Sequence, residues 1–451
     1  MKSIVSAALG SFFVLAISIN AFSVGSAGLG NEVAGARSLG QGGTGMAQAF
    51  GPESLYLNPA VITDLPSLQA TYGITYEDTH SKHTTNAGTE EKMRPIGVAV
   101  PNFSMTSSGW WDDKLTFGLT TQSPYGSETH WSDSGFSRFI STNARLHMLV
   151  VNPAVAMKAN KDISLGVGLD YIRVVTVDTE HMVSGAVLEQ ALIQATGLSG
   201  NPAAAQDFLA RQKAEGHNFS WNAGWYYHPE AFPKHSLGFS YRPKVKLPLY
   251  GGTELTGITG PLSQAVFGST YKTSSETEIF LPQTISLGYA FRVNDRLSTE
   301  FDWGWSDWAG AMKDTNIRYS DPNIGHQSVL TTGNPVKRDW RSTNNFAVGA
   351  NYKVSEPFSV RAGYYYIPWV SPESTFSPSI VDLTRHALTV GGGYQFGKIT
   401  LDLAYNAIFM KSRTINNTIA DYSVGTPGVA NVSGEYSSFI NLVSLNVSAK
   451  F

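Results

Sequence analysis

Three glycines near the N-terminus, Gly40, Gly42 and Gly45, have the spacing of a phosphate-binding loop, Gly-x-Gly-x-x-Gly. Such a loop binds a dinucleotide only between a buried strand and a helix, with an acidic residue about 20 positions further on. The preceding residues, GLGNEVAGAR, are too small and polar for a buried strand. Asp64 lies at a suitable distance, but prolines flank it and a second buried strand is not expected there. The glycines therefore serve another purpose.

Other catalytic patterns are missing from the sequence. It contains neither Gly-x-Ser-x-Gly nor His-Glu-x-x-His. It has no cysteine, which excludes disulfides, thiolate metal sites and cysteine nucleophiles. Its histidines are dispersed, mostly at expected strand ends or in loops, as are His80, His83, His147, His217, His228 and His235. A Ser-His pair assembled by folding is the remaining enzymatic alternative. We expect no enzyme, no cofactor and no metal site.

The composition of the 451 residues indicates an unusual surface. Charged residues make up 15%, against roughly 25% in soluble domains. Aromatic residues reach 12% and there are 44 glycines. The formal net charge of −3 gives no electrostatic reason to bind nucleic acid. After the N-terminus no run of about 18 apolar residues occurs, which excludes a helical membrane protein.

The N-terminus has the pattern of a secretory signal peptide. Lys2 precedes an apolar run from Ile4 to Ile19, and small residues permit cleavage after Ala21 or Ala27. The alternative is a membrane anchor helix, but the run is short and no positive cluster follows it. We therefore expect export from the cytoplasm and exclude residues 1–27 from the fold.

Past Pro66 apolar and polar residues alternate with period two, which is typical of strands. The pattern predicts about fourteen strands, an even number as in single-chain outer-membrane barrels. Their expected ranges are 68–78, 93–103, 114–122, 145–159, 162–178, 217–228, 235–247, 271–291, 296–309, 341–353, 358–367, 386–396, 399–412 and 437–451.

Alternation alone does not distinguish a soluble sandwich from a membrane barrel, because each has one apolar face. The connections do, since long ones alternate with tight turns such as 293–295, 355–357 and 397–398. Outer-membrane barrels have short periplasmic turns and long external loops. The sequence therefore predicts an all-β, antiparallel transmembrane β-barrel of about 14 strands, with side chains such as Val443, Leu445 and Phe451 facing lipid.

The long connection over residues 184–215 reads as two short helices separated by a break at 197–202. Leu188, Leu192 and Ile193 form one apolar stripe, and Phe208 and Leu209 form a second. Either the helices pack on the mouth of their own barrel, or they present an apolar surface where a ligand first binds. A mixture of the two is our expectation.

Several segments, in order, resemble the FadL-type family of outer-membrane transporters for long-chain fatty acids and other hydrophobic compounds. Residues 39–62 resemble its N-terminal hatch, which ends in Asn58-Pro59-Ala60. The stretches LPQTISLGY (281–289), NDR (294–296) and WSDW (305–308) are similar to a mid-barrel signature, and RAGY (361–364) and 386–405 extend the match.

The resemblance implies that residues 28–66 form a plug inside a barrel of residues 67–451, with residues 184–215 as a helical external loop. Small residues let a chain fill a lumen already lined by side chains. The expected plug and gate residues are Gly40, Gly42, Gly43, Gly45, Asn58, Pro59 and Ala60. Transport would be passive, with capture at the external loops, passage through an apolar upper lumen and lateral exit beside the hatch. The N-terminal residues of the mature chain would also reach the ligand.

A carboxylate ligand needs a cation, and strand parity places Arg242, Lys244, Lys246 and Arg361 in the lumen. Their alternative role is pairing with Glu300, Asp302 or Asp402 across the barrel, or with the plug backbone, for stability alone. The ligand-binding candidates are these four cations with Leu188, Leu192, Ile193 and Phe208.

The resemblance further implies a monomer in the outer membrane of a Gram-negative bacterium. Its partners would be outer-membrane lipids, a hydrophobic small molecule and the barrel-assembly machinery during insertion. The alternatives are a barrel scaffold or carrier for surface-protein secretion, uptake of aromatic hydrocarbons, and an open diffusion porin, which a plug disfavours.

Overall fold

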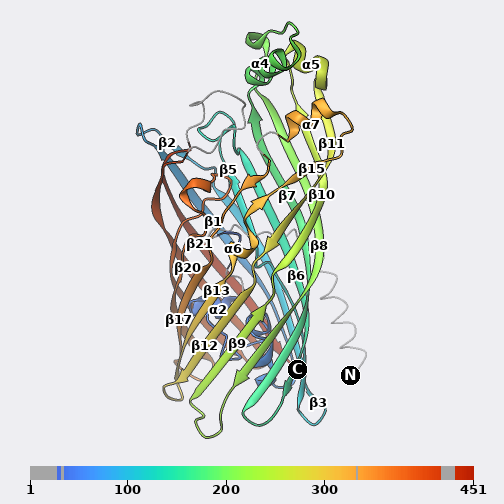
Figure 1. Ribbon diagram of the computed structural model, residues 1–451. Helices are drawn as coiled ribbons and strands as arrows, with labels where there is room; N and C mark the ends of the chain where they lie inside the picture. Colours follow the sequence, from blue (N-terminus) through green and yellow to red (C-terminus); the bar gives the residue numbers. More distant parts are fainter. Residues whose placement is uncertain (1–27, 32–34, 332–333, 418–431) are drawn as a thin grey trace.

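In the computed structural model the chain forms a closed antiparallel barrel of 14 strands (Figure 1). The structure describes residues 28–31, 35–331, 334–417 and 432–451. The expected signal peptide therefore lies outside the described residues. The first and last strands close the barrel, because β1 (Leu68–Thr85) pairs with β21 (Gly434–Lys450) from Gln69 to Thr85. The fold class expected from the alternation is confirmed.

The strands follow one another around the barrel in chain order. Between β1 and β21 they are β3 (Ile96–Trp110), β4 (Leu115–Gln122), β5 (Gly126–His130), β6 (Asn143–Lys158), β7 (Ile163–Val183), β8 (Phe208–Tyr227), β9 (His235–Arg242), β10 (Val245–Thr256), β11 (Thr270–Leu281), β12 (Thr284–Arg292), β13 (Leu297–Ser306), β17 (Thr343–Lys353), β18 (Phe358–Ile367), β19 (Arg385–Phe396) and β20 (Ile399–Ile415). Short external strands are β2 (Glu90–Lys92), β14 (Asp314–Thr315), β15 (Ile317–Tyr319) and β16 (Val336–Lys337).

Three of the fourteen wall strands are each divided into two segments by a proline. Pro124 separates β4 from β5, Pro243 separates β9 from β10, and Pro282 separates β11 from β12. A proline has no backbone N–H to donate to the ladder, so it ends regular pairing at that point. At Pro243 and Pro282 the pairing continues on both sides of the break, whereas at Pro124 it continues only toward β6.

The exterior of the barrel carries the apolar side chains. On β7, Leu165, Val167 and Leu169 are 45%, 55% and 50% exposed, whereas the alternate residues are buried. Val443, Leu445 and Phe451 are likewise exposed, as expected. Exposed apolar side chains on every second residue of a closed barrel are typical of strands that face lipid. No helix in the described ranges is long and apolar enough to cross a membrane.

The short helices lie inside the barrel or at its external end. They are α2 (Ala36–Gly40), α3 (Ser54–Leu57), η1 (Pro59–Asp64), α4 (Gly185–Thr196), η2 (Pro202–Ala204), α5 (Pro261–Phe267), α6 (Trp308–Ala311), α7 (Ile324–Leu330) and η3 (Glu373–Thr375). Figure 1 shows α2 within the barrel, and α4 and α5 at the far end of the long strands β7 and β8.

The expectation of two helices within residues 184–215 is half correct. The first helix is α4, but Phe208 and Leu209 begin β8 instead of a second helix. Phe208 pairs with Val183 of β7, and Leu209 pairs with Thr256 of β10. The ladders of two long neighbouring strands supply hydrogen bonds that outweigh the helical spacing of the apolar residues.

Candidate functional site

The segment expected to be a plug fills part of the barrel interior. Ala36, Leu39, Leu55, Ala60 and Ile62 are all fully buried. Residues of α2 pack against β19 and β20, and η1 packs against β6, β7 and β8. All seven expected plug residues lie within this segment, between α2 and η1. Since the segment touches strands on opposite parts of the wall, it spans the lumen.

Two glycines of the plug make contacts that a side chain would prevent. Gly42 has φ of +75°, and a Cβ atom there would lie 2.6 Å from the carbonyl oxygen of Val348. A Cβ on Gly40 would lie 3.0 Å from the Cα of Gly391. Backbone therefore packs directly on backbone, which requires glycine. Contact of this kind, and not a phosphate, explains the glycine spacing.

Acidic side chains of the wall hold the main chain of the plug. The amide N–H of Gly45 donates to Asp302 Oδ2 at 3.0 Å, and the N–H of Ala47 donates to Glu300 Oε1 at 2.6 Å. An intramolecular hydrogen bond of the ordinary kind contributes about 0.5–1.5 kcal/mol. Both carboxylates are buried. They fix the loop after the glycines in one position.

Asn58, Pro59 and Ala60 form the exit from the plug. The Asn58 side chain accepts from the Ala60 N–H at 3.0 Å, which caps η1, and its amide donates to the carbonyl of Trp225 at 3.1 Å. Pro59 occupies the first position of η1, where a missing N–H costs nothing. The motif thus fixes the chain to β8 before β1 begins.

Apolar side chains face inward beyond the plug, toward the external end. We call this cluster the apolar wall. Its buried members are Met148, Val150, Ile172, Val174, Ala214, Val245, Leu247, Leu249 and Leu281. A second cluster adjoins it and contains Leu29, Trp308, Ala311, Met312, Trp340 and Val370. Tyr125 and Leu146 pack against both clusters, so the apolar surface is continuous. Leu29 brings the N-terminal segment into this surface.

Three of the four cations form ion pairs, and two of these, Arg242 and Arg361, pair with buried carboxylates of the wall. Arg242 contacts Asp170 at 2.6 Å and donates to the carbonyl of Tyr56 at 2.6 Å. Arg361 contacts Asp402 at 2.7 Å. The wall and plug thus use these two arginines for stability, which was the alternative role.

The expectation that Lys246 faces the lumen is wrong. The break at Pro243 shifts the alternation, so that Val245 and Leu247 are buried while Lys246 is exposed and contacts Glu278 at 2.7 Å. Lys244 lies at the break itself. It lies over the ring of Phe280 at 4.6 Å from the centroid, donates to the carbonyl of Gly310, and makes no ion pair with any residue in the described part of the chain.

The external end carries a cap, which we define as α4, α5, α7 and the residues packed between them. Its buried core contains Leu188, Leu192, Phe208, Ala210, Leu255, Ile258, Leu262 and Phe267, with Ile193 partly buried. The apolar stripes noted in the sequence therefore pack on each other in this conformation. Of the two alternatives, this arrangement corresponds to helices packed on their own barrel mouth.

A buried carboxylate fastens α4 to α5. Glu189 accepts from the N–H of Leu262 at 2.9 Å, the N–H and hydroxyl of Ser263 at 2.8 and 2.7 Å, and the N–H of Asn201 at 3.1 Å. Burial raises the pKa of Glu189, but these hydrogen bonds outweigh burial and hold the pKa below its ordinary value. Nothing in the sequence pattern pointed to this residue.

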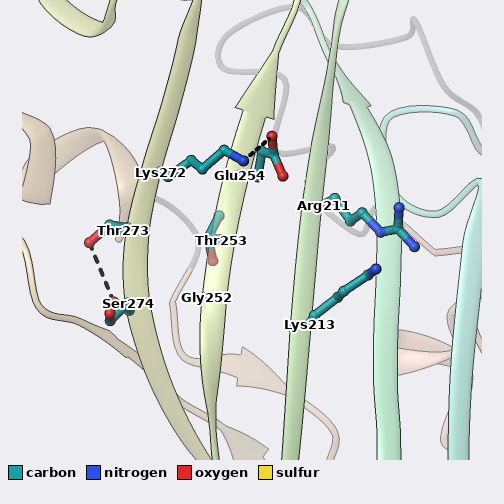
Figure 2. Close-up of a pocket in the computed structure, with 8 residues that line it drawn as sticks. All are labelled: Arg211, Lys213, Gly252, Thr253, Glu254, Lys272, Thr273 and Ser274. Carbon is teal, nitrogen blue, oxygen red and sulfur yellow. Dashed lines mark hydrogen bonds and ion pairs between the residues drawn. The ribbon is translucent and has the colours of Figure 1, made fainter.

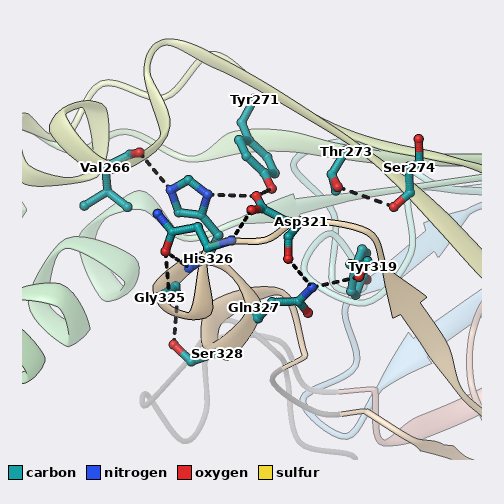
Figure 3. Close-up of polar contacts among 11 residues, drawn as sticks. Val266, Tyr271, Thr273, Ser274, Tyr319, Asp321, Gly325, His326, Gln327 and Ser328 are labelled. Atoms are coloured by element: carbon teal, nitrogen blue, oxygen red, sulfur yellow. Dashed lines mark hydrogen bonds and ion pairs between the residues drawn. The ribbon is translucent and has the colours of Figure 1, made fainter.

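Helix α7 is fastened to α5 by a second polar cluster (Figure 3). His326 Nδ1 lies 2.8 Å from Asp321 Oδ2, and Nε2 lies 3.1 Å from the carbonyl oxygen of Val266. The ring stacks on Phe267 at 4.8 Å. Tyr271 donates its hydroxyl to Asp321. Both ring nitrogens thus lie within hydrogen-bond distance of an oxygen. The cluster joins residues 266–271 to residues 321–326, which are about 50 to 60 positions apart, and the sequence pattern did not reveal this contact.

The strand pairing of the barrel is irregular next to the apolar wall. Gln122 pairs with Val150 of β6, and Gly126 pairs with His147. Between these two pairs, the segment from β4 to β5 covers four residue steps (122 to 126) and β6 covers three (150 to 147), so the first strand contains one extra residue. On the other side, β4 pairs with β3 only from Phe103 onward, and no ladder joins β5 to β3 within the described strands. Residues 96–102 of β3 are left with a free edge.

The N-terminal segment docks on this irregular place. Gly30 forms an antiparallel β-bridge with Tyr125. The N–H of Asn31 donates to the carbonyl of Pro124 at 2.9 Å, and the N–H of Gly126 donates to the carbonyl of Leu29 at 2.9 Å. The plug, the apolar wall and the free edge of β3 therefore meet at residues 123–126.

Comparison with known proteins identifies the family. Residues 15–451 match the sequence profile of the family described as "Outer membrane protein transport protein (OMPP1/FadL/TodX)". The chain belongs to this family. The resemblance drawn from the hatch and mid-barrel segments is thereby confirmed. Members of the OMPP1/FadL/TodX family are outer-membrane transport proteins for hydrophobic compounds, not enzymes, and the chain is a protein of the Gram-negative outer membrane.

Individual relatives are distant but match over nearly the whole length. Outer membrane protein P1 of Haemophilus influenzae is 21% identical over 95% of this chain and 94% of its own. The crystal structure of a Pseudomonas aeruginosa FadL homologue has a TM-score of 0.78 at 19% identity, over 94% of this chain and 100% of that one. The Pseudomonas putida toluene transporter TodX has a TM-score of 0.67 at 19% identity, over 96% and 100%. These likenesses support the same fold.

Proposed function

We propose that this member of the family takes up long-chain fatty acids or similar hydrophobic molecules by passive transport through the barrel. The observation that carries the proposal is the continuous apolar surface that runs to the irregular wall at residues 123–126. An apolar molecule binds such a surface by removing it from water, at about 25 cal/mol per Å². The movement follows the concentration gradient and needs no covalent step.

Capture begins at the cap. Because Leu188, Leu192 and Phe208 are buried against α5, the cap must loosen to expose them to a ligand. The apolar tail then passes along Leu247 and Leu249. Its carboxylate meets Lys244, the expected cation that takes part in no ion pair within the described part of the chain. Arg242 and Arg361 stay with their carboxylates.

The molecule leaves sideways into the bilayer. The free edge of β3 at residues 96–102 borders the exit, because β5 has turned away from it after Pro124. The N-terminal segment covers this place through the bridge of Gly30 to Tyr125. Displacement of that segment by a ligand is the gating step, in which the ligand favours the open arrangement of the plug. The family likeness supports this route.

Uptake by cells tests the function. Cells with and without the protein are given a labelled long-chain fatty acid, an alkane or toluene. Fatty-acid uptake that depends on the protein supports the proposal. Deletion of residues 28–60 should replace selective uptake with an aqueous leak, and unchanged selectivity would contradict a gating plug.

A repaired wall tests the lateral exit separately. Removing Ser123 and changing Pro124→Thr lets β4 and β5 pair with β6 one to one and extends the ladder toward β3. Uptake should fall to the background while the barrel still folds, as shown by heat-modifiable migration in gels. Full uptake through the repaired wall would mean that the molecule leaves along the barrel axis.

Aromatic hydrocarbons are the second candidate substrate, favoured by the fold shared with a toluene transporter. The two candidates differ at Lys244, since an uncharged hydrocarbon needs no cation. Lys244→Gln should lower fatty-acid uptake several-fold and leave toluene uptake unchanged if both use the barrel.

A further inference from the structure

The outer face of the wall made by β7, β8, β10 and β11 changes from apolar to charged along its length. On β8, Phe219 and Trp221 are exposed, and nearer the cap the outward residues are Glu215, Lys213 and Arg211. Because barrels present apolar side chains to hydrocarbon, the charged part stands beyond the hydrocarbon on the external side. Figure 1 shows these strands continuing to the cap. The outer face there borders the polar part of the outer leaflet.

A pocket of about 410 Å³ lies on this charged part (Figure 2). Its lining comes from three adjacent strands: Arg211 and Lys213 of β8, Gly252, Thr253 and Glu254 of β10, and Lys272, Thr273 and Ser274 of β11. The pocket spans two rungs of the sheet. In one rung Glu254 pairs with Arg211 and with Lys272, and in the other Gly252 pairs with Lys213 and with Ser274.

The side chains of both rungs point away from the lumen. Ala210 and Ala214 of β8 and Leu255 of β10 are buried on the inner face, and alternate residues point to the opposite face. The floor of the pocket is open because Gly252 has no side chain. A Cβ there would meet only the backbone of Thr273, with its carbonyl oxygen at 3.1 Å.

The charges in the pocket are unequal. Three cations line it, against the single carboxylate of Glu254, which contacts Lys272 at 2.9 Å. Arg211 is held by Asp178 at 2.5 Å and by Glu180 at 3.0 Å, both from β7. Lys213 forms no ion pair with any residue of the described ranges. Counted with the two carboxylates of β7, three cations face three carboxylates, and Lys213 is the cation whose ammonium group is left for an anion, above the open floor and opposite Ser274.

We propose that this pocket binds a phosphate group carried by a glycolipid of the outer leaflet. A phosphate has several oxygens that accept hydrogen bonds from the Lys213 and Lys272 ammonium groups and from the Ser274 hydroxyl. Its acyl chains would lie on the apolar part of the same strands, along Phe219 and Trp221. Cations that flank an apolar band are the usual means by which a membrane protein holds an anionic lipid headgroup.

Binding to the purified full-length barrel in neutral detergent tests the assignment. The probes are lipopolysaccharide, the same material after enzymatic dephosphorylation, and inorganic phosphate. The double variant Lys213→Gln/Lys272→Gln should bind lipopolysaccharide roughly tenfold more weakly. The matched control is Lys82→Gln/Lys92→Gln, which removes two exposed cations from β1 and β2 at the same end of the barrel. The control should bind as the unmodified protein does.

A second variant separates the pocket from the general charge. Gly252→Leu fills the floor and changes no charge, and it should weaken binding as the double variant does. Heat-modifiable migration establishes that each variant is folded. Equal binding by the pocket variants and the control overturns the proposal, as does equal binding of the dephosphorylated glycolipid. Occupancy by inorganic phosphate as tight as by the glycolipid also overturns it, since the ligand would then be a free anion.

Discussion

The plug and the apolar wall share one barrel, but different interactions hold them. The plug is fixed by directional bonds, since Asp302 and Glu300 accept from its amides, and by glycine contacts such as Gly40 on Gly391. In the apolar wall, represented by Leu247 and Leu249, the side chains contact one another by apolar packing. Directional bonds specify one position, whereas an apolar surface can exchange one apolar neighbour for another. We therefore propose that the plug gates the barrel and that the ligand passes along the apolar wall.

The largest effect is expected from a side chain where the plug touches the barrel. Gly42→Val places a Cβ 2.6 Å from the Val348 carbonyl and requires a φ that valine avoids. The plug should leave its position and the barrel should conduct ions steadily in a planar bilayer. Gly304→Ala is the control, because a Cβ on this wall residue makes only an ordinary contact with Ser286 Oγ at 3.7 Å. A closed Gly42→Val barrel would contradict the role of this contact.

A smaller and opposite effect is expected in the apolar wall. Val150→Thr/Val245→Thr keeps the side-chain shape but adds hydroxyls to the surface. Fatty-acid uptake should fall several-fold with no ionic leak, because the plug contacts are untouched. A leak without loss of uptake would reverse the roles given to the two regions.

A substitution in the cap should change its local stability more than it changes transport. Glu189→Gln leaves amide donors of α5 with a weaker or mismatched partner, at a local cost of about 1–3 kcal/mol. Amide hydrogen exchange in residues 185–205 should accelerate accordingly. Glu215→Gln is the control, since its partner Arg173 and its own side chain are solvent-exposed. Equal exchange in both variants would show that Glu189 does not fasten the cap.

The smallest effect is a loss of local stability in the cap that is expected only at acidic pH. Hydrogen bonds from Tyr271, Asn323 and His326 lower the pKa of Asp321 from 3.8 to about 2. A lowered pKa adds stability that is complete above about pH 4 and is lost as the pH falls toward 2. The protection of amides in residues 324–331, measured against the intrinsic exchange rate at each pH, should therefore fall between pH 4 and pH 2. In Asp321→Asn this protection should already be low at pH 5 and should lack that step.

The barrel could be predicted from the sequence because its signals are local and repeated. Alternation such as that of Val443 and Leu445, together with the long and short connections, was enough for the strand number and their order. The plug required the resemblance, since Gly42 carries no pattern that distinguishes a backbone contact from a phosphate loop. Glycine is required at position 42 because the backbone approaches the carbonyl of Val348, and this contact forms only when the chain has folded.

The errors in the site arose where the chain departs from regular pairing. We assumed that the alternation of inward and outward side chains continues unchanged past Pro243, which placed Lys246 in the lumen. The break at Pro243 reverses this alternation, so Lys246 points outward. Helical spacing around Phe208 was overridden by the ladder to β7. Glu189 and His326 gave no signal, because each joins α5 across a long separation in sequence. Glu189 bonds to Leu262, 73 residues away, and His326 lies against the carbonyl of Val266, 60 residues away.

The route itself can be mapped directly with a photoreactive long-chain fatty acid. After uptake and illumination, mass spectrometry of the full-length protein locates the labelled residues. The account predicts labels on Tyr125, Leu247 and Leu249, and labels on residues 96–102 beside the exit. Labels confined to the barrel exterior, or to the lumen on the periplasmic side of the plug around Ser298 and Ser359, would contradict passage along the apolar wall.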